Sequence, residues 1–289
     1  MLKKIFYQNR LAPSVYFFPA IYFVGWSSIT LISTFSPELQ QNKSLLGTLI
    51  TAILFIIILP YWSRHRWGKN IIDGVGLRCW RKNNISSLLN EFLKSILIIS
   101  FIALLILCFD YGQYSLNFNI GVVLNSILLF IAVGVLEELI FRVWLYEELN
   151  LWFNQKISNL LQALIFAIVH LKFQMDIMNT IQLLIGLFLL GLYLNSWRKR
   201  THGNIMIPIC FHGSIVALWF FINNSLLLVT NDIPELFFGP GSNDSFNPVG
   251  GLLGIFMLLI LNMFYTPIFS DFLSFSGRTL RDSSNDDLP

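Results

Sequence analysis

Two adjacent carboxylates and an arginine lie inside a stretch that otherwise carries no charge. Glu137, Glu138 and Arg142 are the charged residues between Ile120 and Tyr146. A charged side chain at the centre of a bilayer costs about 2.5–3.5 kcal/mol on insertion scales, and such residues mark functional sites. On a helix, Glu138 and Arg142 share a face and are predicted to form an ion pair. Glu137 is rotated by about 100° from Glu138, so it is predicted to face another helix.

Two histidines extend this set of residues. His170 and His212 lie inside other apolar segments, whereas His65 and His202 lie in basic loops. A single buried histidine is more often a hydrogen-bonded structural residue than a ligand. Two of them on separate helices, beside a helix with a glutamate pair, favour a site that activates water. They can do so around a general base or as ligands of a metal ion, and the residue types leave both alternatives open.

The composition places these residues in a membrane protein. The chain has 289 residues, of which 55% are hydrophobic and 12% are charged, and its mean hydropathy is +0.66. Soluble domains carry about 25% charged residues. Because about 20 apolar residues cross a bilayer as a helix, the prediction is an all-α polytopic integral membrane protein with about eight transmembrane helices. The predicted spans are residues 14–36, 45–63, 88–109, 120–146, 157–174, 177–197, 204–229 and 250–270.

The charges between these spans predict the orientation of the chain. Basic residues gather before the first span and in the second, fourth and sixth loops. Such loops are typically cytoplasmic, so both termini are predicted to be cytoplasmic, in a plasma membrane of the bacterial type or a thylakoid membrane. The net charge of +3 therefore reflects topology and does not indicate nucleic-acid binding. We expect a single membrane domain over residues 1–275, with a catalytic core at about 120–229, and a disordered polar tail over 276–289.

At the polar residues the sequence resembles a known family, the CPBP intramembrane proteases. This family includes CAAX prenyl endopeptidases and bacteriocin-processing or immunity proteins of the Abi type. The resemblance runs from Leu124 to about Leu218, and the eight-span frame is similar to that of the family. It depends on three motifs in order, which are Glu137-Glu138-x-x-x-Arg142, Phe166-x-x-x-His170, and His212 after a Gly-Asn and Pro stretch.

The resemblance implies a role for each motif residue. Glu137 would be the general base toward a water molecule, with His170 sharing that task. Glu138 and Arg142 would keep Glu137 oriented, and His212 would hold the water or stabilise the oxyanion. Because the family is often described as metalloproteases, Glu137, His170 and His212 are also the candidate ligands of a zinc ion, and metal dependence stays open. The implied substrate is a membrane-embedded or lipid-anchored peptide or protein.

One position departs from the family pattern. The last family motif is His-x-x-x-Asn or a similar polar residue, whereas this chain has Val216. Losing one oxyanion donor costs about 2.7–4 kcal/mol of transition-state stabilisation. Ser214 and Asn204 are nearby polar residues, but neither has the same spacing.

The favoured function is hydrolysis of a peptide bond at or within the membrane. The alternatives are a catalytically inactive scaffold or immunity protein, and a transporter with a carboxylate relay, although the repeats and broken helices of a transporter are not evident.

Overall fold

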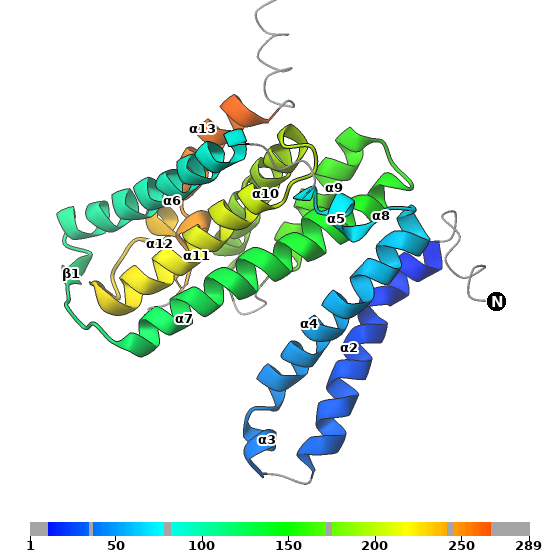
Figure 1. Ribbon diagram of the computed structural model, residues 1–289. Helices are drawn as coiled ribbons and strands as arrows, with labels where there is room; N and C mark the ends of the chain where they lie inside the picture. The colour runs from blue at the N-terminus through cyan, green and yellow to red at the C-terminus, as the bar shows by residue number, and fades with distance from the viewer. Residues whose placement is uncertain (1–10, 35–36, 78–81, 172–174, 242–245, 267–289) are drawn as a thin grey trace, which may run out of the picture.

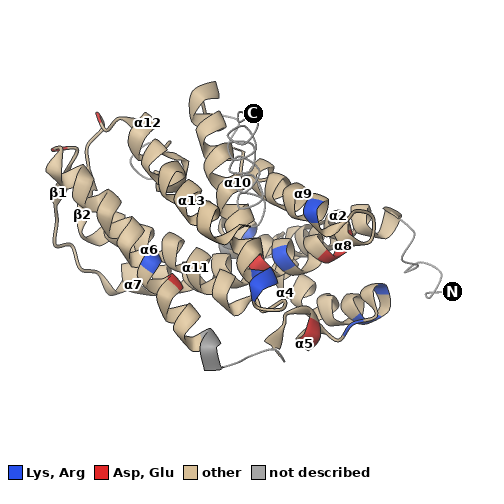
Figure 2. Cartoon of the chain, turned by 90° about the horizontal axis from the view of Figure 1, so that it is seen from above, with Lys and Arg blue, Asp and Glu red and all other residues tan. Residues whose placement is uncertain are grey.

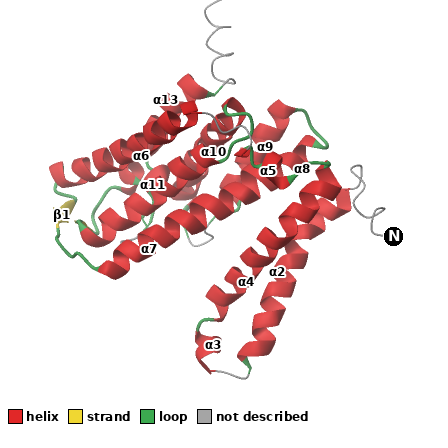
Figure 3. Cartoon of the chain, viewed as in Figure 1, coloured by secondary structure: helices red, strands yellow, loops and turns green. Residues whose placement is uncertain are grey.

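The computed structural model describes residues 11–34, 37–77, 82–171, 175–241 and 246–266. The polar tail predicted for residues 276–289 lies outside these ranges. The described chain is almost entirely helical, as Figure 3 shows. In chain order its elements are α2 (Leu11–Ser33), α3 (Pro37–Gln41), α4 (Lys43–Trp62), η1 (Ser63–Trp67), α5 (Ile71–Gly74), α6 (Lys82–Cys108), β1 (Gly112–Tyr114), α7 (Ile120–Ile131), η3 (Ala132–Leu145), α8 (Tyr146–Asn150), α9 (Gln155–Ile168), α10 (Ile177–Arg200), α11 (Met206–Ser225), β2 (Leu227–Val229), α12 (Glu235–Phe238), η4 (Pro248–Gly250) and α13 (Leu252–Tyr265).

The protein is an all-α polytopic membrane protein, as predicted. Within the described residues, six helices are long and apolar enough to cross a membrane, namely residues 11–33, 43–67, 85–108, 120–150, 177–200 and 206–225. The predicted spans at 157–174 and 250–270 correspond to α9 and α13, which have 14 residues each. At 1.5 Å per residue these helices are about 21 Å long, which is shorter than a hydrocarbon core of about 30 Å. The count of eight spans therefore stays a prediction.

A central helix organises the bundle. Helix α11 packs against α6, α7 and η3, while α10 packs against α9 and α13 (Figure 1). The helices α2 and α4 pack on each other and diverge from this bundle, which they meet near α8 (Figure 1). An aromatic cluster fills the junction, where Phe17 stacks on Trp144 with ring centroids 5.2 Å apart. The motif residues on η3, α9 and α11 are therefore held by the bundle, apart from the outer part of the α2–α4 pair.

The loops separate into two groups at opposite ends of the bundle. Strand β1 pairs antiparallel with β2, with Gly112 opposite Val229, so the α6–α7 and α11–α12 connections lie together. In Figure 2 the described charged positions at the end with β1 and α12 are acidic, whereas basic positions gather near α5 and α8. This grouping agrees with the predicted alternation of basic loops. The assignment of the basic end to the cytoplasm stays a prediction.

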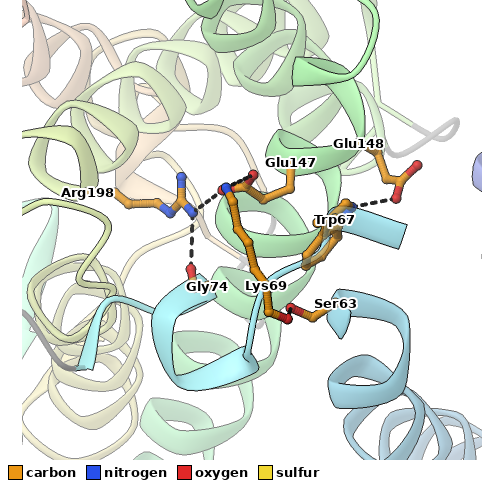
Figure 4. Close-up of polar contacts among 7 residues, drawn as sticks. All are labelled: Ser63, Trp67, Lys69, Gly74, Glu147, Glu148 and Arg198. Carbon is orange, nitrogen blue, oxygen red and sulfur yellow. Dashed lines mark hydrogen bonds and ion pairs between the residues drawn. The ribbon is translucent and has the colours of Figure 1, made fainter. Parts of the chain in front are cut away.

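Ion pairs join three connections at the basic end. Glu147 accepts hydrogen bonds from Lys69 at 2.7 Å and Arg198 at 2.9 Å, and Arg198 also donates to the carbonyl of Gly74 at 3.2 Å (Figure 4). The neighbouring Glu148 is a second hub. Its buried carboxylate accepts from Ser14, from Trp62 and Trp67 at 2.8 Å each, and from Arg66 at 3.2 Å. These contacts connect α2, α4 and η1 to the end of the long helix that carries Glu137 and Glu138.

Before α13 the chain turns back into the bundle, so that α13 begins only at Leu252. Residues 246–251, called the inner segment below, pack against the middle of α10. A Cβ atom added to Gly186 of α10 would lie 2.1 Å from the carbonyl oxygen of Val249, so the approach requires glycine. The Trp219 indole donates to the carbonyl of Phe246 at 2.8 Å. Irregular backbone at membrane depth is tolerated where protein buries it or where it lines a cavity.

Candidate active site

The predicted ion pair is present in the centre of the bundle. The Arg142 and Glu138 side chains are 3.1 Å apart, and both are fully buried. The same Glu138 oxygen accepts a hydrogen bond from Nδ1 of His212 at 2.8 Å. The Arg142 guanidinium lies 4.3 Å from the ring centre of Phe166, within the range of a cation–π contact. Glu138 therefore links η3 to α11, and Phe166 helps to hold Arg142.

Glu137 faces away from this pair toward the two histidines, as expected. Its Oε2 atom is 3.5 Å from Nε2 of His170 and 3.9 Å from Nε2 of His212. Its side chain is 25% exposed, whereas that of Glu138 is completely buried. The two carboxylates thus have different environments, one open to a cavity and one closed in the core.

The backbone and the second carboxylate fix both imidazole rings. His170 lies in the turn after α9, where its Nδ1 atom is 2.6 Å from the carbonyl oxygen of Phe166. The Nδ1 atom of His212 is bonded to Glu138. Both contacts place the hydrogen on Nδ1 and leave Nε2 directed at Glu137. In this arrangement the hydrogen-bond partner of Nδ1 sets the tautomer and the orientation of the imidazole ring, as is common for catalytic and metal-binding histidines.

The motif also raises the question of a metal ion. Two imidazole nitrogens and a carboxylate oxygen form a donor set that suits zinc. However, in the part of the chain that the structure describes, no group of three or more His, Cys, Asp or Glu side chains is placed to hold one ion. The candidate zinc ligands Glu137, His170 and His212 therefore gain no support from this geometry.

Glu137, His170 and His212 open into a cavity of about 470 Å³. Val216 lines this cavity, one helical turn beyond His212, so the departure from the family motif falls at the site itself. Ser214 and Asn204 do not line the cavity. Asn204 instead accepts from the backbone N–H of Met206 at 2.8 Å. Besides the three polar motif residues, the lining consists of Leu129, Val133, Leu187, Leu190, Ile215, Val216, Trp219, Phe220, Asn223, Asn224, Phe246, Asn247, Pro248 and Val249.

Comparison with known families gives a match over the part of the chain that forms this site. Residues 119–218 match the family described as type II CAAX prenyl endopeptidase Rce1-like. The match supports the assignment of residues 119–218, called the Rce1-like domain below, to the CPBP family. Residues 2–71 match a second family, a domain of unknown function called DUF8676. Searches of curated proteins and of solved structures give no match.

The Rce1-like domain contains every motif residue from Glu137 to His212 and agrees with the range predicted from the motifs. The DUF8676 match covers α2, α4 and η1, which meet the Rce1-like domain through the Glu148 hub. The proposed single membrane domain over residues 1–275 stays a prediction. The cavity extends beyond the Rce1-like domain, because the inner segment forms part of its wall.

A glycine contact positions the Rce1-like motifs and was not singled out from the sequence. A Cβ atom added to Gly134 would lie 3.1 Å from the Cα atom of Gly213 and 3.1 Å from the carbonyl oxygen of Ile209. Gly134 is one turn before Glu138, and Gly213 follows His212. The two small residues let η3 approach α11 closely, which brings the Glu138 carboxylate within reach of the His212 ring. Their positions beside the motif residues were the available signal.

Proposed function

We propose that this protein is an intramembrane endopeptidase of the CAAX-protease type that hydrolyses a peptide bond with water activated by Glu137. The observation that carries this proposal is the position of Glu137, whose Oε2 atom faces the Nε2 atoms of His170 and His212 at the wall of a cavity. The Rce1-like domain supports the same reaction class. The remainder of the wall is largely apolar, which suits a membrane-embedded or lipid-anchored peptide as substrate.

In this mechanism the Glu137 carboxylate accepts a proton from a water molecule while the water oxygen attacks the carbonyl carbon of the peptide bond. His170 holds the water with Glu137. His212, oriented by Glu138, stabilises the negative charge that develops on the carbonyl oxygen. It does so in its doubly protonated form, in which Nδ1 still donates to Glu138 and Nε2 carries a second hydrogen that it donates to the substrate oxygen. The proton on Glu137 then passes to the leaving amine nitrogen as the C–N bond breaks. Arg142 and Phe166 keep Glu138 in place and do not touch the substrate.

The test of this proposal is a Glu137→Gln variant in cells. Glutamine preserves the shape of the side chain and removes its basicity, so the protein should be made and inserted normally but lose cleavage. Comparative proteomics of membrane fractions should then show the same uncleaved substrate that accumulates in a deletion strain. Asp232→Asn is the matched control, because Asp232 is an exposed carboxylate that does not line the cavity.

A second function is favoured by one observation, the apolar Val216 side chain in the cavity wall. A catalytically inactive scaffold or immunity protein would need no oxyanion donor there. If Glu137→Gln is silent while deletion of the protein has a phenotype, the scaffold replaces the protease. The transporter is disfavoured because the helix with Glu137 runs unbroken from Ile120 to Asn150, whereas transporter sites typically use discontinuous helices.

A further inference from the structure

The cavity has a polar side that the Rce1-like motifs do not provide. Three asparagines, Asn223, Asn224 and Asn247, line it together with Glu137 and Val216. Asn247 belongs to the inner segment and comes from a different part of the chain than the other two. Because Val216 cannot donate a hydrogen bond, these amides are the candidate donors to a peptide in the cavity.

The inner segment holds Asn247 in a defined conformation. Its side-chain Oδ1 accepts from the backbone N–H of Val249 at 3.1 Å, and its own N–H donates to the carbonyl of Pro240 at 2.9 Å. Its carbonyl oxygen packs so closely that a Cβ atom added to Gly239 would lie 2.0 Å from it. The segment is thus fixed by these contacts, and the Asn247 amide needs little reorganisation to bind a ligand.

The orientation of this amide determines what it can offer. Since Oδ1 is used by Val249, the remaining polar atom is Nδ2, which carries two hydrogens and can only donate. Within the described residues Nδ2 of Asn247 has no hydrogen-bond partner, and the side chain is half-buried at the cavity wall. A half-buried donor without a partner, beside apolar walls, suits a carbonyl oxygen.

The other two asparagines fit this role less well. Nδ2 of Asn224 already donates to the carbonyl of Phe220 at 2.8 Å, so it is used within its own helix. Asn223 lies seven residues after Val216 on α11, which is about 10 Å along the helix axis and further from His212. Asn247 is therefore the strongest donor in the described part of the cavity.

We propose that Asn247 is a substrate-binding residue, which donates a hydrogen bond from Nδ2 to a carbonyl oxygen of the peptide substrate. It supplies from the inner segment the donor that Val216 lacks. The proposal rests on the proposed peptidase function and adds to it that the substrate lies between Glu137 and the inner segment, with a peptide carbonyl turned toward Asn247. Peptide main chain in an unwound conformation has such carbonyls free, whereas helical main chain does not.

The experiment compares Asn247→Ser with Asn224→Ser. Serine keeps the acceptor for the Val249 N–H at the start of η4 but removes the amide donor. The probe is a fluorescent peptide ending in a prenylated CAAX sequence, and its binding is measured by anisotropy on full-length protein in nanodiscs. All variants are made in the Glu137→Gln background, so that cleavage does not interfere. Asn247→Ser should weaken binding by about 10-fold, the value of one lost hydrogen bond, and Asn224→Ser should not.

A restored donor at position 216 provides a second, sharper criterion. Val216→Asn should recover most of the affinity lost in Asn247→Ser and should add little to the protein that retains Asn247. Equal affinity of Asn247→Ser and the Glu137→Gln parent would overturn the inference, and so would a loss seen in Asn223→Ser instead. If wild-type protein binds the probe without cleaving it, the peptidase proposal fails while the role of Asn247 is still decided by the affinities. No binding to the parent would overturn both.

Discussion

Breaking the buried Glu138–Arg142 ion pair should lower the free energy of unfolding more than breaking an exposed ion pair. In Arg142→Met the fully buried Glu138 loses its cationic partner at 3.1 Å and keeps only the contact with His212 at 2.8 Å. Removing one partner of a buried pair costs about 3–5 kcal/mol. The lost contact between the guanidinium and the Phe166 ring at 4.3 Å adds about 0.5–2 kcal/mol. The assay is unfolding of purified protein in detergent, followed by heat and by denaturant.

The double variant Glu138→Gln with Arg142→Met decides whether the two residues are partners. Glutamine removes the unpaired charge, and its carbonyl oxygen still accepts from Nδ1 of His212, so most of the lost stability should return. The matched control is Lys69→Met, which breaks a pair with a 48% exposed lysine and should cost less than about 1 kcal/mol. A double variant as unstable as Arg142→Met alone would refute the pairing argument.

Three further predictions follow from other parts of the molecule. Gly134→Ala pushes a methyl group against the backbone of Gly213 and Ile209. This overpacking should lower the free energy of unfolding by about 1–3 kcal/mol and reduce cleavage. Gly74→Ala is the control, because an added Cβ atom there lies 3.6 Å from its nearest neighbour, and it should have neither effect. The pKa of the Asp176 carboxyl is lowered, chiefly because it accepts a hydrogen bond from the Asn179 N–H. Its contribution to the free energy of unfolding is therefore present at neutral pH and is lost as the pH falls through the folded-state pKa. Asp176→Ala should lower the melting temperature at neutral pH but not in strong acid, whereas Asp176→Asn, which keeps the cap, should behave like wild type at neutral pH. In a cysteine-free background, a cysteine at Asp232 should react with an impermeant thiol reagent in intact cells and one at Gly68 should not, and the reverse pattern would invert the predicted topology.

The sequence predicted those features that depend on neighbours along one helix. The Glu138–Arg142 pair follows from the spacing of four residues. The approach of His170 and His212 to Glu137, which lies between helices, was expected from the resemblance to the CPBP family and not from spacing. The bond from His212 to Glu138 was not predicted, because it depends on how η3 and α11 rotate against each other. That rotation is set by Gly134 and Gly213, which lie far apart in the chain.

The bounds of two predicted spans were wrong, because apolar sequence continues past the ends of the helices α9 and α13. Residues 169–171 are Val-His-Leu, which looks like a continuation of α9, yet the helix ends at Ile168. The eighth predicted span began at Gly250, which the structure places in the inner segment. Hydropathy does not distinguish a helix from irregular backbone that other helices bury, so the segment with Asn247 was missed. Pro248 and the glycines at 250 and 251 were the available signals.

The short helix α9 affects the lipid around the protein. The Lys199 ammonium donates to the carbonyl of Gln155 at 3.3 Å, so α9 and α10 are level at the basic end. With 14 residues against 24, α9 stops about 15 Å before the other end of α10. Its outer stripe, formed by Ile157, Leu164 and Ile168, therefore matches acyl chains only over part of the leaflets. A bilayer thins beside such a short element. The thinned region is then expected next to His170, where the proposed hydrolysis needs water. Lipids with shorter acyl chains should then lower the work of supplying that water, so that membrane thickness itself would tune the rate of cleavage.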